Sequence, residues 1–128
     1  MRAVSLMSAL AAATAVLAAA PVAAHPRLVS STPAQASTVA KPRAIVLTFS
    51  ERLMPAASGF DLVMTGMPGM SDHAPMKISG FTASLGPDGK SLRAALPRPL
   101  PAGTYELNWF AVAADTHRIK GKISFTVR

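Results

Sequence analysis

One segment of the chain carries sulfur and nitrogen side chains at a constant spacing of three residues. These side chains belong to Met64, Met67, Met70, His73 and Met76. A period of three could mark one face of a helix. Pro68 and Pro75 interrupt the segment, however, and proline removes a backbone donor from a helix interior. The sequence therefore predicts a loop that is rich in thioether groups.

The chemistry that suits such a loop is soft-metal binding. Thioether sulfur is soft and uncharged, which favours Cu(I). Thiols outside the cytoplasm oxidise to disulfides, whereas thioethers do not, and the chain contains no cysteine. The competing interpretation is that some methionines fill gaps in a core. Met64 could end a strand and point inward, and Met54, which lies outside the run, is predicted to pack.

The first 24 residues are typical of a cleaved secretory signal peptide. Arg2 is followed by an uncharged, alanine-rich run, and Val22-Ala23-Ala24 supplies the small residues of a cleavage site. A transmembrane anchor is the competing interpretation, because the apolar run approaches the length of a membrane span. We predict export to the periplasm, with residues 1–24 removed and a single domain over residues 25–128.

Cleavage after Ala24 would make His25 the first residue of the mature protein. Its free amine and its imidazole could then close a chelate ring on one metal ion. Pro26 has no N–H, so the next peptide nitrogen cannot deprotonate and ligate. Nitrogen and oxygen donors in tetragonal geometry favour Cu(II). The alternative for His25 is a frayed terminus.

Two further side chains could complete such a site. Asp115 and His117 are two residues apart, so an extended backbone would place both on the same face. The carboxylate could bind metal directly or orient an imidazole. Glu51, after the predicted strand 45–49, is another candidate oxygen ligand. The alternatives are a surface or capping histidine at position 117 and a solvated carboxylate at position 51, beside Arg52.

The elements that must hold these residues are short strands. Eleven prolines and eight glycines oppose long helices. Apolar and polar residues alternate along 45–49, 105–111 and 123–127, and weaker strands are expected near 27–31, 60–64, 78–84 and 92–95. Pro87-Asp88-Gly89 is typical of a tight turn. We predict an all-β fold, a small antiparallel Greek-key β-sandwich.

The charge of the chain is positive, with 13 Lys and Arg against 6 Asp and Glu, a net charge of +7 and an isoelectric point near 10.9. Such a balance can indicate nucleic-acid binding. Here the basic residues are scattered, and export would remove the usual nucleic-acid partners. The charge could instead favour an acidic partner surface or an anionic membrane, or serve solubility.

Four segments, in this order along the chain, carry a family resemblance: His25-Pro-Arg-Leu-Val-Ser-Ser-Thr-Pro33, Leu47-Thr-Phe-Ser-Glu51, Met64-Thr-Gly-Met-Pro-Gly-Met70 and Asp115-Thr-His117. Gly121 and Phe125 follow the last segment. Together they resemble the CopC family of periplasmic copper-resistance proteins, and the resemblance covers essentially all of residues 25–128.

The resemblance implies an immunoglobulin-like or cupredoxin-like sandwich with two copper sites at opposite ends. It assigns Cu(II) to His25, Glu51, Asp115 and His117. It assigns Cu(I) to Met64, Met67, Met70, His73 and Met76. It also implies a partner, either a CopD-type copper transporter of the inner membrane or another copper-resistance protein.

The function predicted from the sequence is a periplasmic copper carrier in copper resistance and homeostasis, and not an enzyme. No nucleophile and base remain once His25 and His117 are assigned to copper. The alternative is a copper oxygenase acting on polysaccharide, which would also use an N-terminal histidine. A third hypothesis is an accessory β-domain whose histidines are incidental.

Overall fold

The computed structural model describes residues 25–70 and 74–128. The predicted signal peptide, residues 1–24, and His73 of the predicted Cu(I) site lie outside the described residues. Within them the chain forms nine strands and one short 3-10 helix. Their bounds are β1 Leu28–Thr32, β2 Thr38–Val39, β3 Ala44–Phe49, η1 Pro55–Ala57, β4 Gly59–Gly66, β5 Met76–Ile78, β6 Ser84–Leu85, β7 Ser91–Ala95, β8 Gly103–Val112 and β9 Arg118–Val127.

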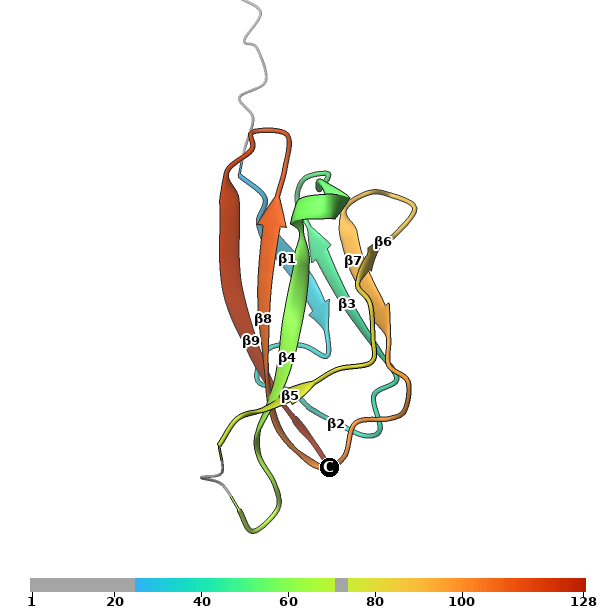
Figure 1. Cartoon of the computed structure of the whole chain (residues 1–128), viewed down its shortest axis with the longest axis vertical. Coiled ribbons are helices and arrows are strands. Elements are labelled where there is room, and N and C mark those ends of the chain that lie inside the picture. The colour runs from blue at the N-terminus through green and yellow to red at the C-terminus, as the bar shows by residue number, and fades with distance from the viewer. Residues whose placement is uncertain (1–24, 71–73) are drawn as a thin grey trace, which may run out of the picture.

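The strands form two sheets that pack face to face (Figure 1). One sheet has the order β1-β3-β7-β6 and the other the order β2-β9-β8-β4-β5. Neighbouring strands are antiparallel, except that the short β2 runs parallel to β9. The predicted all-β sandwich is confirmed. Among the described residues, no helix is long and apolar enough to cross a membrane.

The alternating sequence pattern explains which side chains form the core. The predicted strands 45–49, 105–111 and 123–127 lie within β3, β8 and β9, and their buried residues belong to one apolar cluster. Phe49 of one sheet meets Trp109 of the other edge to face, with ring centroids 5.2 Å apart. This contact joins the two sheets across the core.

The structure differs from the prediction at the shortest elements. The segment 78–84 is not one strand, because β5 ends at Ile78 and β6 begins at Ser84. Gly80 lies between them with a φ of +88°, a conformation that strand residues do not adopt. The two-residue β2 was not predicted, since two residues are too few to show alternation.

Tyr105 fixes the start of β8 against the preceding loop. Its hydroxyl donates a hydrogen bond of 2.7 Å to the carbonyl of Pro101, and its ring stacks on Phe125. A tyrosine that bonds back to the chain a few residues upstream is a hallmark of immunoglobulin-like sandwiches. Burial raises the pKa of Tyr105 to about 12.

We expect this tyrosine to report directly on the folded state, since it is the only one in the chain. In the folded protein its phenol should ionise near pH 12, whereas an exposed tyrosine has a pKa of 10.0. The unfolded state therefore releases this proton at lower pH than the folded state does. The stability that this difference contributes is fully present below pH 10 and is lost as the pH rises from 10 to about 12. Ultraviolet absorbance of the phenolate against pH measures the midpoint.

The substitution Tyr105→Phe is the matched control. It should abolish the titration and lower the free energy of unfolding by about 1–3 kcal/mol, because the Pro101 carbonyl loses its donor. A midpoint near pH 10 in the folded protein would contradict the burial of the hydroxyl.

Candidate metal centre

Two separate parts of the chain bring nitrogen and oxygen donors to one end of the sandwich. His25 lies just before β1, whereas Asp115 and His117 lie in the connection between β8 and β9 (Figure 1). This connection is tight. Val112 pairs with Arg118, and the N–H of Thr116 donates to the carbonyl of Ala113 at 2.9 Å. The β8–β9 hairpin therefore holds Asp115 and His117 beside the start of β1.

Asp115 is the centre of this group. Its Oδ2 lies 2.6 Å from Nδ1 of His25 and 3.7 Å from Nδ1 of His117. One donor atom from each of the three residues lies within 4.8 Å of the other two. The Asp115 side chain is 10% exposed, whereas the two imidazoles are 56% and 72% exposed. A buried carboxylate thus lies beneath two accessible imidazole rings.

The hydrogen bonding of this carboxylate is incomplete. Oδ1 accepts a hydrogen bond from the backbone N–H of His117 at 3.2 Å. Oδ2 is buried and receives no hydrogen bond from the described residues, although two imidazole nitrogens are close. A buried carboxylate oxygen without a donor is costly. A cation shared by Oδ2 and the two nitrogens would compensate that cost, and a set of two imidazoles and one carboxylate suits Cu(II).

Glu51 lies outside this converging group. It follows β3, whose last residue Phe49 pairs with Leu28 of β1. Beyond that pair, the N–H of Ser50 donates to the carbonyl of Arg27 at 2.9 Å. Glu51 is therefore half-buried at the same end of the sandwich, but its carboxylate is not among the donors that the structure brings together.

The connection between β4 and β5 lies at the opposite end of the sandwich (Figure 1). Within it, Met67 and Met70 pair to form a tight hairpin. Each backbone N–H donates to the other residue's carbonyl, at 3.0 and 2.9 Å. Pro68 and Gly69 form the turn, with Gly69 at a φ of +76°. Pro-Gly with positive φ at the second position is the signature of a type II turn. Directly paired residues project their side chains to the same face, so both thioethers emerge on one side.

The other methionines divide between the surface and the core. Met76, on the edge strand β5, is 51% exposed, and Met70 is 55% exposed. Met64 pairs with Met76 in register but is only 4% exposed and belongs to the core. The structure therefore separates Met64 from the exposed thioethers of the predicted Cu(I) set.

The prediction that Met54 packs is wrong. Its side chain is 44% exposed, because it lies in the connection between β3 and η1, outside the core. Its N–H donates to the carbonyl of Val112 at the end of β8. Sequence reasoning missed an exposed thioether at the end of the sandwich that holds the histidine cluster. Its place beside the apolar Leu53 gave no signal of exposure.

The fold and the cluster define a small β-sandwich protein with a candidate metal centre at one end. Several known proteins are similar to this chain in sequence and structure. Residues 28–128 match the model of the CopC domain family. Copper resistance protein C of Escherichia coli is 50% identical over 105 residues, covering 82% of each chain. Copper resistance protein C of Xanthomonas campestris pv. juglandis is 49% identical, covering 82% of this chain and 81% of its own.

A crystal structure of PcoC, a methionine-rich copper resistance protein from E. coli, superposes with a TM-score of 0.74. It is 47% identical and covers 82% of this chain and 100% of its own. The chain belongs to the CopC family. The prediction that it is not an enzyme agrees with these relatives, which are named as copper resistance proteins.

We expect Asp115→Asn to weaken Cu(II) binding at least roughly tenfold, because it removes the one negative charge at the centre of the cluster. Calorimetric titration of the chain beginning at His25 measures the affinity. Asp88→Asn is the matched control, since it removes the same charge from a turn, where Asp88 accepts the N–H of Lys90. Equal affinities for the two variants would exclude Asp115 as a ligand.

Proposed function

We propose that the protein is a periplasmic carrier that binds copper in copper resistance and homeostasis. The observation that carries this proposal is the buried Oδ2 of Asp115, which lies between two imidazole nitrogens and accepts no hydrogen bond from the described residues. Membership of the CopC family supports copper as the metal. In this proposal the copper ion is the cargo.

The proposed Cu(II) site consists of His25, Asp115 and His117, with Glu51 as a further oxygen ligand. Removal of residues 1–24 by a signal peptidase would free the amine of His25. The amine and Nδ1 would then chelate the ion, while His117 and Asp115 supply the remaining nitrogen and oxygen donors. The exposure of both imidazoles would let an ion enter and leave without unfolding the hairpin.

The proposed Cu(I) site uses the exposed thioethers of Met67, Met70 and Met76 together with His73. Thioether sulfur is a soft donor and favours the lower oxidation state. Met64 could join this set only if its side chain left the core, where it is 4% exposed. The two sites would lie at opposite ends of the sandwich (Figure 1). Copper could then pass to a CopD-type transporter of the inner membrane or to another copper-resistance protein.

The alternative, a copper oxygenase acting on polysaccharide, finds less support. Enzymes of that kind need an exposed surface on which sugar rings can stack. The only tryptophan and the only tyrosine of the chain, Trp109 and Tyr105, are 8% and 1% exposed. Copper-dependent consumption of peroxide with cleavage of a polysaccharide would favour the oxygenase over the carrier.

The variant His25→Ala should abolish Cu(II) binding and leave Cu(I) binding intact, because the amine–imidazole chelate is lost. A bound ion stabilises the native state, so the melting temperature with each ion separately is the measurement. Sequencing of the exported protein's N-terminus tests whether it begins at position 25. Processing at another position would contradict the chelate, and loss of both ions would indicate misfolding.

The double variant Met67→Leu with Met70→Leu should give the opposite pattern. Leucine keeps the volume of these exposed side chains and removes the sulfur, so Cu(I) should no longer raise the melting temperature, while Cu(II) still should. Met54→Leu is the control, since it removes an exposed thioether at the other end. Unchanged stabilisation by Cu(I) in the double variant would contradict the hairpin as the site.

A further inference from the structure

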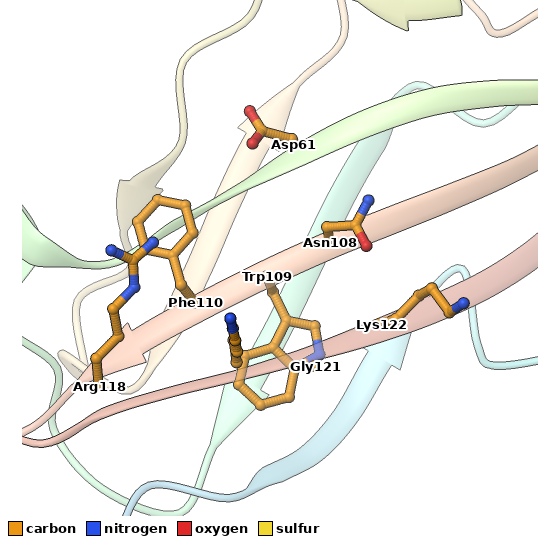
Figure 2. A pocket seen from close by; sticks show the side chains of 8 residues that line it. Asp61, Asn108, Trp109, Phe110, Arg118, Gly121 and Lys122 are labelled. Carbon is orange, nitrogen blue, oxygen red and sulfur yellow. The ribbon is translucent and has the colours of Figure 1, made fainter. Parts of the chain in front are cut away.

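The outer face of the five-stranded sheet contains a pocket of about 380 Å³ that belongs to neither proposed copper site. Side chains of β4, β8 and β9 line it, and Asn108 lies near its middle (Figure 2). Trp109 and Gly121 also line it. They are directly paired, and a Cβ on Gly121 would overlap the indole ring. Gly121 alternates with Lys120 and Lys122, so its lack of a side chain makes room for the indole on the core side of the sheet and lets Trp109 form the floor of the pocket.

Three cations border this pocket from one strand. Arg118, Lys120 and Lys122 alternate along β9, so they project to the same face, and all three are exposed. Lys122 pairs with Glu106 at 3.6 Å. Among the described residues, no carboxylate lies within ion-pair distance of Arg118 or Lys120. Asp61, a carboxylate that also lines the pocket, pairs with Lys77 at 3.7 Å. Arg118 and Lys120 are therefore two positive charges without an ion-pair partner among the described residues, beside a concave surface.

The guanidinium of Arg118 is held in place by an aromatic ring. It lies 4.4 Å from the centroid of Phe110, which projects outward from β8 (Figure 2). Such a cation–π contact fixes the long side chain and leaves the edge of the guanidinium fork free to donate hydrogen bonds. A fixed guanidinium binds carboxylates with two parallel hydrogen bonds.

The edge of β9 is also open along this stretch. At Ser124 its backbone is occupied, because the N–H donates to Oε1 of Gln35 and the carbonyl accepts the N–H of Ala36. Beyond Ser124, β2 pairs with Thr126 and Val127. In the described part of the chain, no strand pairs with residues 118–122 on the side away from β8.

We propose that this face binds an extended acidic segment of a partner protein. The two unpaired cations supply charge complementarity, and the open edge supplies backbone groups that an extended segment can bond. A membrane suits the face less, because insertion into lipid needs exposed apolar side chains. The large exposed ones of the described residues, Val29, Met54, Met67, Met70 and Met76, lie outside this pocket.

The place of this face gives the binding a consequence for the metal centre. Arg118 directly follows His117, so a segment bound along β9 would end beside the histidine cluster. A partner that docks here would present its acidic residues next to the proposed Cu(II) site. This consequence rests on the proposed function, whereas the docking itself does not need copper.

The test measures the affinity of copper-free protein for a fluorescein-labelled peptide of alternating Glu and Ser, about six residues long, by fluorescence anisotropy. That length covers the open stretch of β9 at roughly 3.4 Å per residue. Arg118→Ser with Lys120→Ser should weaken binding about fivefold, since two exposed ion pairs are lost. Lys120→Glu should weaken it at least as much. A Gln-Ser peptide should not bind.

The matched control is Lys90→Ser with Arg93→Ser, which lowers the net charge equally but changes exposed residues of the other sheet and its preceding turn. This variant should bind the Glu-Ser peptide within twofold of the unchanged protein. Equal weakening in both double variants would show attraction by net charge alone and overturn the proposal. A lack of binding of the Glu-Ser peptide would also overturn it. Sedimentation on phosphatidylglycerol vesicles that depends on Arg118 and Lys120 would then assign the face to a membrane.

Discussion

The pairing of β8 with β9 is the constraint on which the rest of the molecule depends. It runs without a break from Gly103 paired with Val127 to Val112 paired with Arg118. One end of this ladder holds the Asp115–His117 connection, and the other adjoins the Met67–Met70 hairpin, because Gly66 pairs with Thr104. Ten residues at about 3.4 Å each separate the two ends by roughly 30 Å. An ion could not be shared between the two proposed copper sites, so copper exchange between them would need a partner or release into solution.

How far the sequence predicts this structure depends on the length of each pattern. Alternation predicted β3, most of β8 and the second half of β9, because one side of the strand is buried along each of these stretches. In the first half of β9 the inward-facing residues are only half-buried, and the pattern there is too weak to predict a strand. The structure of the methionine run was harder to predict from the sequence. Its period of three hides the period of two that the backbone follows in β4, where Leu62 and Met64 both face the core. The register irregularity between Met64 and Gly66, and the turn at Pro68-Gly69, then bring the next methionines to the surface. The candidate ligands can be identified from the sequence, but the residue at which β4 ends and the hairpin begins cannot.

The histidine cluster shows a different limit. Asp115 and His117 are neighbours in the sequence, so their proximity follows from local geometry. Their contact with His25 does not, since it requires β1 of one sheet to begin beside the β8–β9 connection of the other. The contact between Phe49 and Trp109 joins those two sheets. Long-range packing therefore places the third donor, and only a family resemblance could anticipate it.

Charge balance supports Glu51 as a further ligand of the proposed Cu(II) site, although its carboxylate lies outside the group of converging donor atoms. Neutral imidazoles add no charge, so a Cu(II) ion held by His25, His117 and Asp115 would keep one uncompensated positive charge. Arg118, next to His117, adds to this imbalance. The half-buried carboxylate of Glu51 lies at the same end of the sandwich, after β3, and would neutralise the loaded centre. Because a carboxylate is attracted to a net positive charge, this balance favours a movement of Glu51 towards the ion when copper binds.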